Sequence, residues 1–178
     1  YSLPTLHRHI QAFEEPLSGV DHQTCFAMKA NSSLAILTYM ARHGLGADVV
    51  SGGELYRALK SGVPGEKIVY SGVGKTTGEI EMAIAAGIMM FNIESEQELE
   101  VINECAGTLE KKAPISIRVN PDVDPMTQPY ISPGMRENKF GIDVEASLAQ
   151  YLKAREMENI EIVGIDCHIG SQLTDLSP

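Results

Sequence analysis

Short apolar runs alternate with stretches of helical periodicity along almost the whole chain, and this alternation restricts the fold more than any other feature. The runs are rich in Val, Ile, Ala and Met, a composition typical of buried strands. We predict strands at residues 24–29, 47–51, 67–71, 89–94, 115–120 and 162–168. We predict helices at residues 34–43, 54–60, 77–86, 96–106 and 145–158. Repeated strand–helix units imply parallel strands joined by right-handed crossovers.

The spacing of these units favours an α/β fold of the (β/α)8 TIM-barrel type. An average repeat of roughly two dozen residues suits a barrel better than an open sheet with long crossovers. The chain supplies about six of the eight units that close such a barrel. We therefore expect residues 1–178 to form an incomplete N-terminal barrel domain, with the last barrel strands and a C-terminal β domain outside it. The lower-ranked alternative is a complete six-stranded doubly wound domain.

The charge and the cysteines exclude several classes of function. A net charge of −10 argues against general affinity for nucleic acids or anionic membranes, because both require a basic surface. Cys25, Cys105 and Cys167 have neither a zinc-binding spacing nor the density of a disulfide framework, so no metal is predicted. No signal peptide and no apolar run of transmembrane length is visible. A cytoplasmic enzyme fits these features.

Lys29 is the most informative single residue, because it ends the apolar run Cys25-Phe26-Ala27-Met28 with a lone cation. The carboxyl ends of parallel strands surround the ligand site in α/β folds. Desolvation there favours the neutral amine, which can attack a carbonyl group. The alternative is a lysine that merely leaves the core and extends to solvent.

Further polar residues lie at the ends of other predicted strands. Asp48 lies in the second strand, Arg118 ends the fifth and His168 ends the sixth. Glycine-rich turns follow at residues 51–53 and 170–172, and their backbone N–H groups suit a bound phosphate or carboxylate. Individually, Asp48 and Arg118 could form an internal ion pair, and His168 could be a core histidine. Their position at one end of the sheet favours a functional site.

Two apparent motifs are discounted. The segment Ser71-Gly72-Val73-Gly74-Lys75-Thr76 resembles a nucleotide-binding P-loop, but the full pattern requires glycine at position 69, which is Val69. We interpret this segment as a strand-to-helix turn. Cys167 and His168 are adjacent, and adjacent strand residues point to opposite faces, so they make a poor metal-binding pair.

Six segments together resemble the bacterial diaminopimelate decarboxylases, pyridoxal-phosphate enzymes of the alanine racemase-like barrel class (fold type III) that are related to ornithine and arginine decarboxylases. The resemblance covers nearly the whole chain, in order. It is specific for the cofactor class, and residues 51–54 and 129–132 extend it to the substrate. The segments are Phe26–Asn31, Ala47–Glu54, Lys67–Lys75, Arg118–Pro121, Asn138–Ile142 and His168–Gln172.

The resemblance implies a catalytic pair. Lys29 is expected to form the Schiff base with pyridoxal 5'-phosphate, and His168 to stack on the cofactor ring. The implied reaction converts meso-2,6-diaminopimelate to L-lysine and carbon dioxide in lysine biosynthesis. The alternatives are a decarboxylase for another basic amino acid, a racemase on the same barrel, and a non-catalytic pyridoxal-phosphate-binding protein.

The resemblance also implies the remaining cofactor contacts. Ser171 is expected to hold the phosphate, Asp48 and Arg118 to line the base of the site, and Glu54 to lie near the cofactor with a less certain role. The family's phosphate loop, its pyridine-nitrogen acid and its proton-donating cysteine have no match in this chain. The family builds its site from two subunits, so the resemblance implies a homodimer with a shared active site, and a fragment that is inactive alone.

Overall fold

The computed structural model describes residues 1–121, 123 and 140–170, and it contains a seven-stranded, entirely parallel sheet. The strands are β1 (Cys25–Ala27), β2 (Gly46–Val49), β3 (Ile68–Tyr70), β4 (Met90–Ile93), β5 (Ala113–Asn120), β6 (Ile142–Asp143) and β7 (Ile160–Cys167). The helices are α1 (Leu3–Glu14), α2 (Leu34–Arg42), α3 (Gly52–Lys60), α4 (Thr77–Ala86), α5 (Glu96–Thr108) and α6 (Val144–Arg155).

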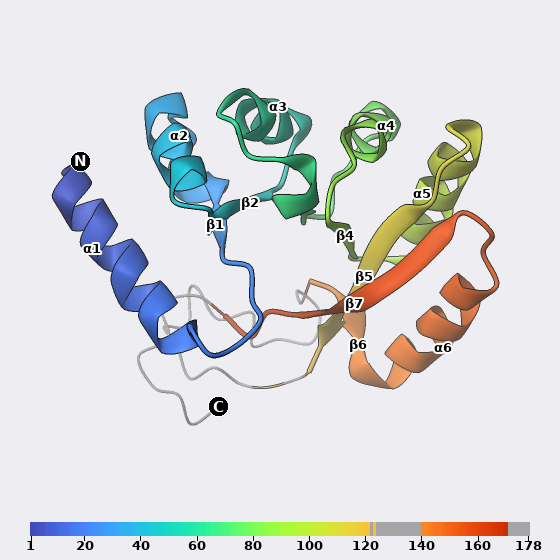
Figure 1. The fold of residues 1–178 in the computed structure, drawn as a ribbon. Coiled ribbons are helices and arrows are strands. Elements are labelled where there is room, and N and C mark those ends of the chain that lie inside the picture. Colours follow the sequence, from blue (N-terminus) through green and yellow to red (C-terminus); the bar gives the residue numbers. More distant parts are fainter. Residues whose placement is uncertain (122, 124–139, 171–178) are drawn as a thin grey trace.

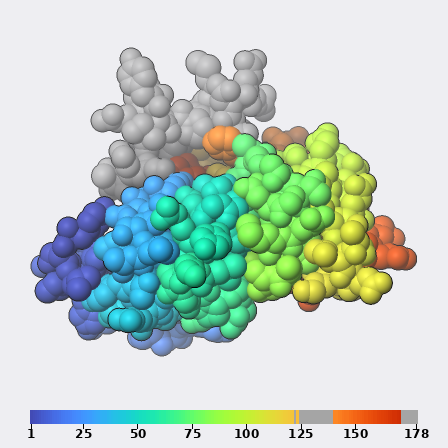
Figure 2. Space-filling view, turned by 90° about the horizontal axis from the view of Figure 1, so that it is seen from above, coloured from blue at the N-terminus to red at the C-terminus, as the bar shows by residue number. Residues whose placement is uncertain are grey.

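The strands follow one another across the sheet in chain order from β1 to β5, and β7 pairs with β5. The short β6 pairs only with the last two residues of β5. The helices α2 to α5 cover a single face of the sheet (Figure 1), and in Figure 2 the helices from α1 to α5 form one continuous row. A doubly wound sheet reverses its strand order and carries helices on both faces, so the barrel-type prediction is confirmed.

The two faces of the sheet differ in polarity, and β5 shows this most clearly. Ile115, Ile117 and Val119 are buried in the main apolar core. They alternate with Ser116 and Arg118, because successive side chains on a strand point to opposite faces. The core therefore forms between the sheet and its helices, and the polar side chains face the barrel interior.

Helix starts in this fold follow directly from strand ends, and side-chain oxygens cap several of them. Ser51 accepts the N–H of Glu54 at the start of α3, and Ser95 accepts the N–H of Glu98 at the start of α5. Thr76 begins α4 with a capping box. A cap satisfies an N–H that the helix itself leaves unpaired. The caps thus fix each turn at the edge where the site lies.

The structure adds α1 to the elements predicted from the sequence. Its Leu6 and Ile10 pack on Ile36 and Met40 of α2 in a small separate apolar cluster. The two-residue strand β6 is a second element that the sequence does not predict. The main boundary differences are that β1 ends two residues early, because residues 28–30 form a 3-10 turn, and that α6 ends at Arg155. Among the described residues, no helix is long and apolar enough to cross a membrane.

Candidate active site

A pocket of about 830 Å³ lies at the carboxyl ends of the strands, the edge at which the sequence places its functional residues. Its wall includes Lys29 after β1, Asp48 of β2, Arg118 of β5 and His168 after β7. The structure therefore brings together four of the predicted site residues from strands that are far apart in the sequence.

Lys29 and His168 lie on the two outer strands of the pocket, and both side chains are accessible. Neither makes a hydrogen bond or an ion pair within the described part of the chain. Partial burial lowers the pKa of His168, and the positive charges of Arg118 and Lys29 lower it further. The imidazole is therefore mainly neutral near pH 7. The 3-10 turn buries Met28 and leaves Lys29 exposed within the described residues, so the expected desolvation of its amine stays a prediction.

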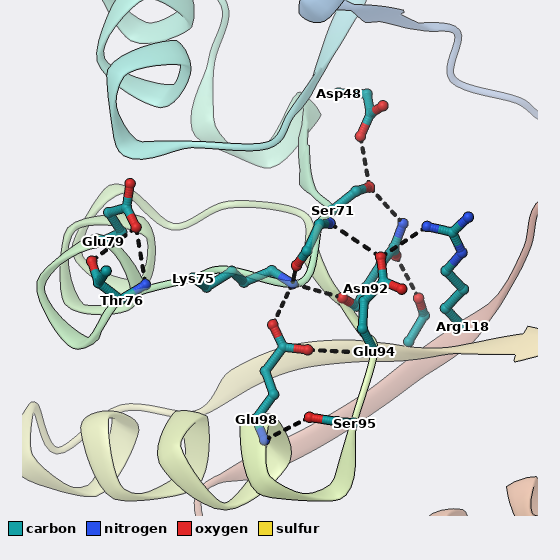
Figure 3. A network of polar contacts seen from close by, with 12 residues as sticks. Asp48, Ser71, Lys75, Thr76, Glu79, Asn92, Glu94, Ser95, Glu98 and Arg118 are labelled. Carbon is teal, nitrogen blue, oxygen red and sulfur yellow. Dashed lines mark hydrogen bonds and ion pairs between the residues drawn. The ribbon is translucent and has the colours of Figure 1, made fainter. Parts of the chain in front are cut away.

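Asp48 is half-buried, and its Oδ1 accepts a hydrogen bond of 2.7 Å from the hydroxyl of Ser71 (Figure 3). Among the described residues Asp48 and Arg118 form no ion pair with each other, and each has a different partner. The prediction that they approach each other inside the barrel mouth stays a prediction. β3 and β4 separate the two residues, and polar side chains of those strands intervene. Both residues nevertheless line the pocket.

Arg118 pairs with carboxylates of the two neighbouring strands. Its Nη1 donates to Glu94 Oε1 at 2.8 Å, and its Nε lies 3.9 Å from Asp166 Oδ2. Burial raises the pKa of Asp166, although the charge of Arg118 opposes that shift. The Oε2 of Glu94 is buried and has no hydrogen-bond partner within the described residues. The pocket therefore holds a buried carboxylate oxygen that is free to accept a donor.

The P-loop-like segment is a turn between β3 and α4, as predicted, and its lysine points inward (Figure 3). The ammonium group of Lys75 donates to the carbonyls of Gly72 and Asn92 and to Glu98 Oε1 at 2.5 Å. The other oxygen of Glu98 accepts the N–H of Glu94. The side chain of Lys75 is fully buried. Its hydrogen bonds connect the turn after β3 with the turn after β4.

Two other predicted site residues, Glu54 and Ser171, are not among these pocket-lining groups. Glu54 accepts the N–H of Val50 at 2.8 Å and does not line the pocket, so its cofactor role stays a prediction. Ser171 lies outside the described residues. Cys167 and His168 both line the pocket, contrary to the expectation of opposite faces, because β7 ends at Cys167.

Sequence reasoning missed several polar residues of this site, among them Ser71, Asn92, Glu94 and Asp166. A signal for three of them was present. Asn92 and Glu94 alternate with apolar residues at the end of a strand, and Asp166 precedes His168 by two residues. Period-two spacing within a strand places such residues on one face, so the strand predicted over residues 162–168 places Asp166 on the face of His168. In the structure β7 ends at Cys167, and Asp166 and His168 both line the pocket.

Comparison with known proteins assigns the family. Residues 3–178 match the family described as pyridoxal-dependent decarboxylase, pyridoxal binding domain. Diaminopimelate decarboxylase of Aquifex aeolicus is 56% identical over 158 residues, which are 89% of this chain and 38% of that protein. The enzyme of the same name from Vibrio cholerae is 51% identical over 178 residues, which are 100% of this chain and 43% of that protein. The chain thus spans less than half the length of these relatives.

Solved structures agree with this assignment. Diaminopimelate decarboxylase from Helicobacter pylori, complexed with L-lysine, matches with a TM-score of 0.96 and 44% identity, covering 100% of this chain and 45% of that one. The enzyme from M. jannaschii, also in complex with L-lysine, matches with a TM-score of 0.86 and 48% identity, covering 97% of this chain and 41% of that one. The predicted family and its pyridoxal cofactor are confirmed. The chain belongs to the pyridoxal-dependent decarboxylase family, whose pyridoxal binding domain it matches over residues 3–178.

Proposed function

We propose that this chain is the cofactor-binding part of a decarboxylase that converts meso-diaminopimelate to L-lysine and carbon dioxide, a step of lysine biosynthesis. One observation carries the proposal: the amine of Lys29 and the imidazole of His168 line one pocket from opposite ends of the sheet. The names of the relatives supply the substrate, and two similar structures are described as complexes with L-lysine.

The pocket suits pyridoxal phosphate. A volume of about 830 Å³ lies within the usual range for small-molecule sites. The aldehyde of the cofactor needs a primary amine that is not engaged elsewhere, and Lys29 makes no ion pair within the described residues. The aromatic ring needs a flat partner, and His168 offers an imidazole that is mainly neutral near pH 7. The buried Oε2 of Glu94, which has no hydrogen-bond partner in the described part of the chain, adds an acceptor at the pocket wall.

The pocket residues of this chain then have different roles in the proposed reaction. Bound pyridoxal phosphate supplies the electron sink that decarboxylation requires. Lys29 provides the amine that holds the cofactor until the substrate amine replaces it. His168 supports one face of the ring and keeps it in place, which preserves the orientation of the departing carboxylate. Asp48 and Arg118 set the charge at the base of the pocket, where Glu94 and Asp166 balance the guanidinium.

We further propose that the full-length protein is a cytoplasmic homodimer whose site is shared between subunits, and that the chain alone is inactive. The relatives are more than twice as long as the matched part. The last strand, β7, exposes Ile162, Val163 and Ile165 by 39%, 48% and 68%, as expected of a surface that further chain covers. All three cysteines are free thiols, which suits a reducing compartment.

The decisive experiment uses the full-length protein that contains this chain. Addition of pyridoxal phosphate should produce a visible absorption band, and meso-diaminopimelate should then yield equal amounts of carbon dioxide and L-lysine. Arginine, ornithine and lysine serve as competing substrates in parallel reactions. Faster turnover of one of these would overturn the substrate assignment. A band without turnover of any amino acid would favour a non-catalytic binding protein, and interconversion of stereoisomers would favour a racemase.

A further inference from the structure

A chain of side-chain hydrogen bonds crosses four adjacent strands and ends at Asp48. The hydroxyl of Ser116 on β5 donates to Asn92 Oδ1 on β4 at 2.6 Å. The Nδ2 of Asn92 donates to Ser71 Oγ, just after β3, at 3.1 Å. The hydroxyl of Ser71 donates to Asp48 Oδ1 on β2 at 2.7 Å (Figure 3). Asn92 and Ser116 are register partners in the sheet, so the backbone itself places these groups in one row.

The direction of this chain follows from the chemistry of its members. An ionised carboxylate can only accept, so the single hydroxyl hydrogen of Ser71 must point to Asp48. The oxygen of Ser71 is then an acceptor, which fixes the amide group of Asn92 with its nitrogen towards Ser71. Asn92 in turn presents its oxygen to Ser116. Every donor therefore points towards Asp48, and hydrogen bonds aligned in this way polarise one another.

The two ends of this row of hydrogen bonds differ in burial. Ser116 is fully buried and does not line the pocket, whereas Asn92, which is 6% exposed, lines it together with Ser71 and Asp48. Buried polar groups cost free energy unless they are hydrogen-bonded. If Asn92 and Ser116 served packing alone, apolar residues could take their places. Their hydrogen bonds to one another and to Ser71 therefore suggest a second role. Ser71 occupies Oδ1 of Asp48 and leaves Oδ2 for a group inside the pocket.

We propose that Ser71, supported by Asn92 and Ser116, is a positioning residue that fixes the carboxylate of Asp48 so that Oδ2 faces the bound cofactor. This inference rests on the proposed function for the identity of the ligand. It assigns roles to three residues outside the predicted catalytic set, and Ser71 acts only through Asp48.

A double-mutant cycle on cofactor affinity tests this dependence. The dissociation constant of pyridoxal phosphate is measured by absorption and fluorescence titration of the full-length protein. Ser71→Ala should raise it about tenfold, as expected when a hydrogen bond to a charged group is lost, and Ser116→Ala roughly twofold to threefold. In an Asp48→Ala background each effect should shrink below about twofold, because residues that act through one another are not additive. Equal effects in both backgrounds would overturn the proposal.

Two controls sharpen the cycle. Ser61→Ala removes a buried hydroxyl that donates to the carbonyl of Ala58 at 2.7 Å, away from the pocket, and should leave the affinity unchanged. Ser71→Thr keeps the hydroxyl and should restore most of the affinity. If it instead behaves as Ser71→Ala does, the hydroxyl is not the cause.

Crystal structures of the cofactor-free wild-type and Ser71→Ala proteins give a readout that does not depend on the ligand. The side chain of Asp48 should leave its wild-type orientation in the variant, and an unmoved Asp48 would refute the positioning role. If the wild-type protein binds no pyridoxal phosphate, the proposed function fails, while the two structures still decide whether Ser71 orients Asp48.

Discussion

The inner strands and the outer strands of the pocket satisfy their polar side chains in different ways. On β2 to β5, Asp48, Asn92 and Arg118 each bind to neighbouring strands, and Lys75 makes three hydrogen bonds from a fully buried position. On the outer strands, Lys29 and His168 are accessible and form no hydrogen bond within the described residues.

This difference distinguishes groups that are preorganised from groups that are free to react with a ligand. Groups with internal partners are held in place before a ligand arrives, and such fixed dipoles and charges stabilise a bound group without reorganisation. Groups without internal partners remain available to form bonds with the ligand. We therefore expect residues at the ends of the outer strands to react with the ligand. We expect residues of the inner strands to fix the geometry of the pocket and to contribute much of its stability.

The strongest test of this division is Lys29→Ala in the full-length protein. Loss of the amine should lower kcat at least about a thousandfold, with little change in folding, because the side chain has no hydrogen bond or ion pair to any described residue. Borohydride reduction of the wild-type protein with pyridoxal phosphate, followed by peptide mapping, should label Lys29. A label on Lys60 or Lys75 instead would refute the assignment.

The inner strands should show the opposite response. Lys75→Met leaves Glu98 as a buried carboxylate without its cation, which should lower the free energy of unfolding by about 3–5 kcal/mol. Urea unfolding of the full-length protein measures this. The double variant Lys75→Met, Glu98→Gln removes the unpaired charge and should recover a good part of the loss. If Lys75→Met proves as stable as the wild-type protein, the buried network does not support the turns.

His168 gives a smaller effect that depends on pH. Its pKa is lowered in the folded state, mainly by burial, so the unfolded chain binds more protons at and below the usual value of 6.5. Stability should therefore fall as the pH drops through this range, and His168→Gln should reduce that fall. Urea midpoints at about pH 7.5 and pH 5.5 measure it. His9→Gln, on the exposed face of α1, is the control. The same pH dependence in wild type and His168→Gln would contradict the assignment.

The smallest effect is expected at Lys153, the surface counterpart of Lys75. Its ammonium group lies 2.5 Å from both Glu96 and Glu100 and so links α6 to α5, but the three side chains are 34%, 46% and 51% exposed, respectively. Exposed ion pairs gain little, because water and salt screen them. Lys153→Met should leave the unfolding midpoint nearly unchanged. A loss comparable to that of Lys75→Met would show that burial does not govern these pairs.

The sequence predicts the fold better than the details of the site. Apolar periodicity locates the main strands, and the rule that ligands bind at strand ends brings Lys29, Asp48, Arg118 and His168 to one pocket. The sequence pattern does not identify the partner of Arg118, because ion pairing depends on the register between strands and on side-chain direction. The pattern of residues along one strand gives no information on either.

Helix α1 and the exposure of Lys29 also cannot be predicted from local sequence patterns. The helix α1 gains its stability from contacts of Leu6 and Ile10 with α2, and a tertiary contact of this kind outweighs weak local preference. The exposure of Lys29 depends on a 3-10 turn at residues 28–30, which ends the strand before the lysine, although the lysine still lines the pocket. A continuous apolar run does not reveal such a turn.

The order of the strands also decides how far apart in the sequence the walls of the pocket are tied together. Sheet neighbours from β1 to β5 are consecutive in the chain, and their register partners lie 21 residues apart for Cys25 and Gly46 and 24 residues apart for Phe91 and Ile115. Pairing at so short a separation closes only small loops, and the entropy cost of closing a loop rises with its length. The wall of the pocket from Asp48 to Arg118 therefore depends on short-range pairing, whereas β7, which ends just before His168, pairs with β5 across a longer stretch of chain.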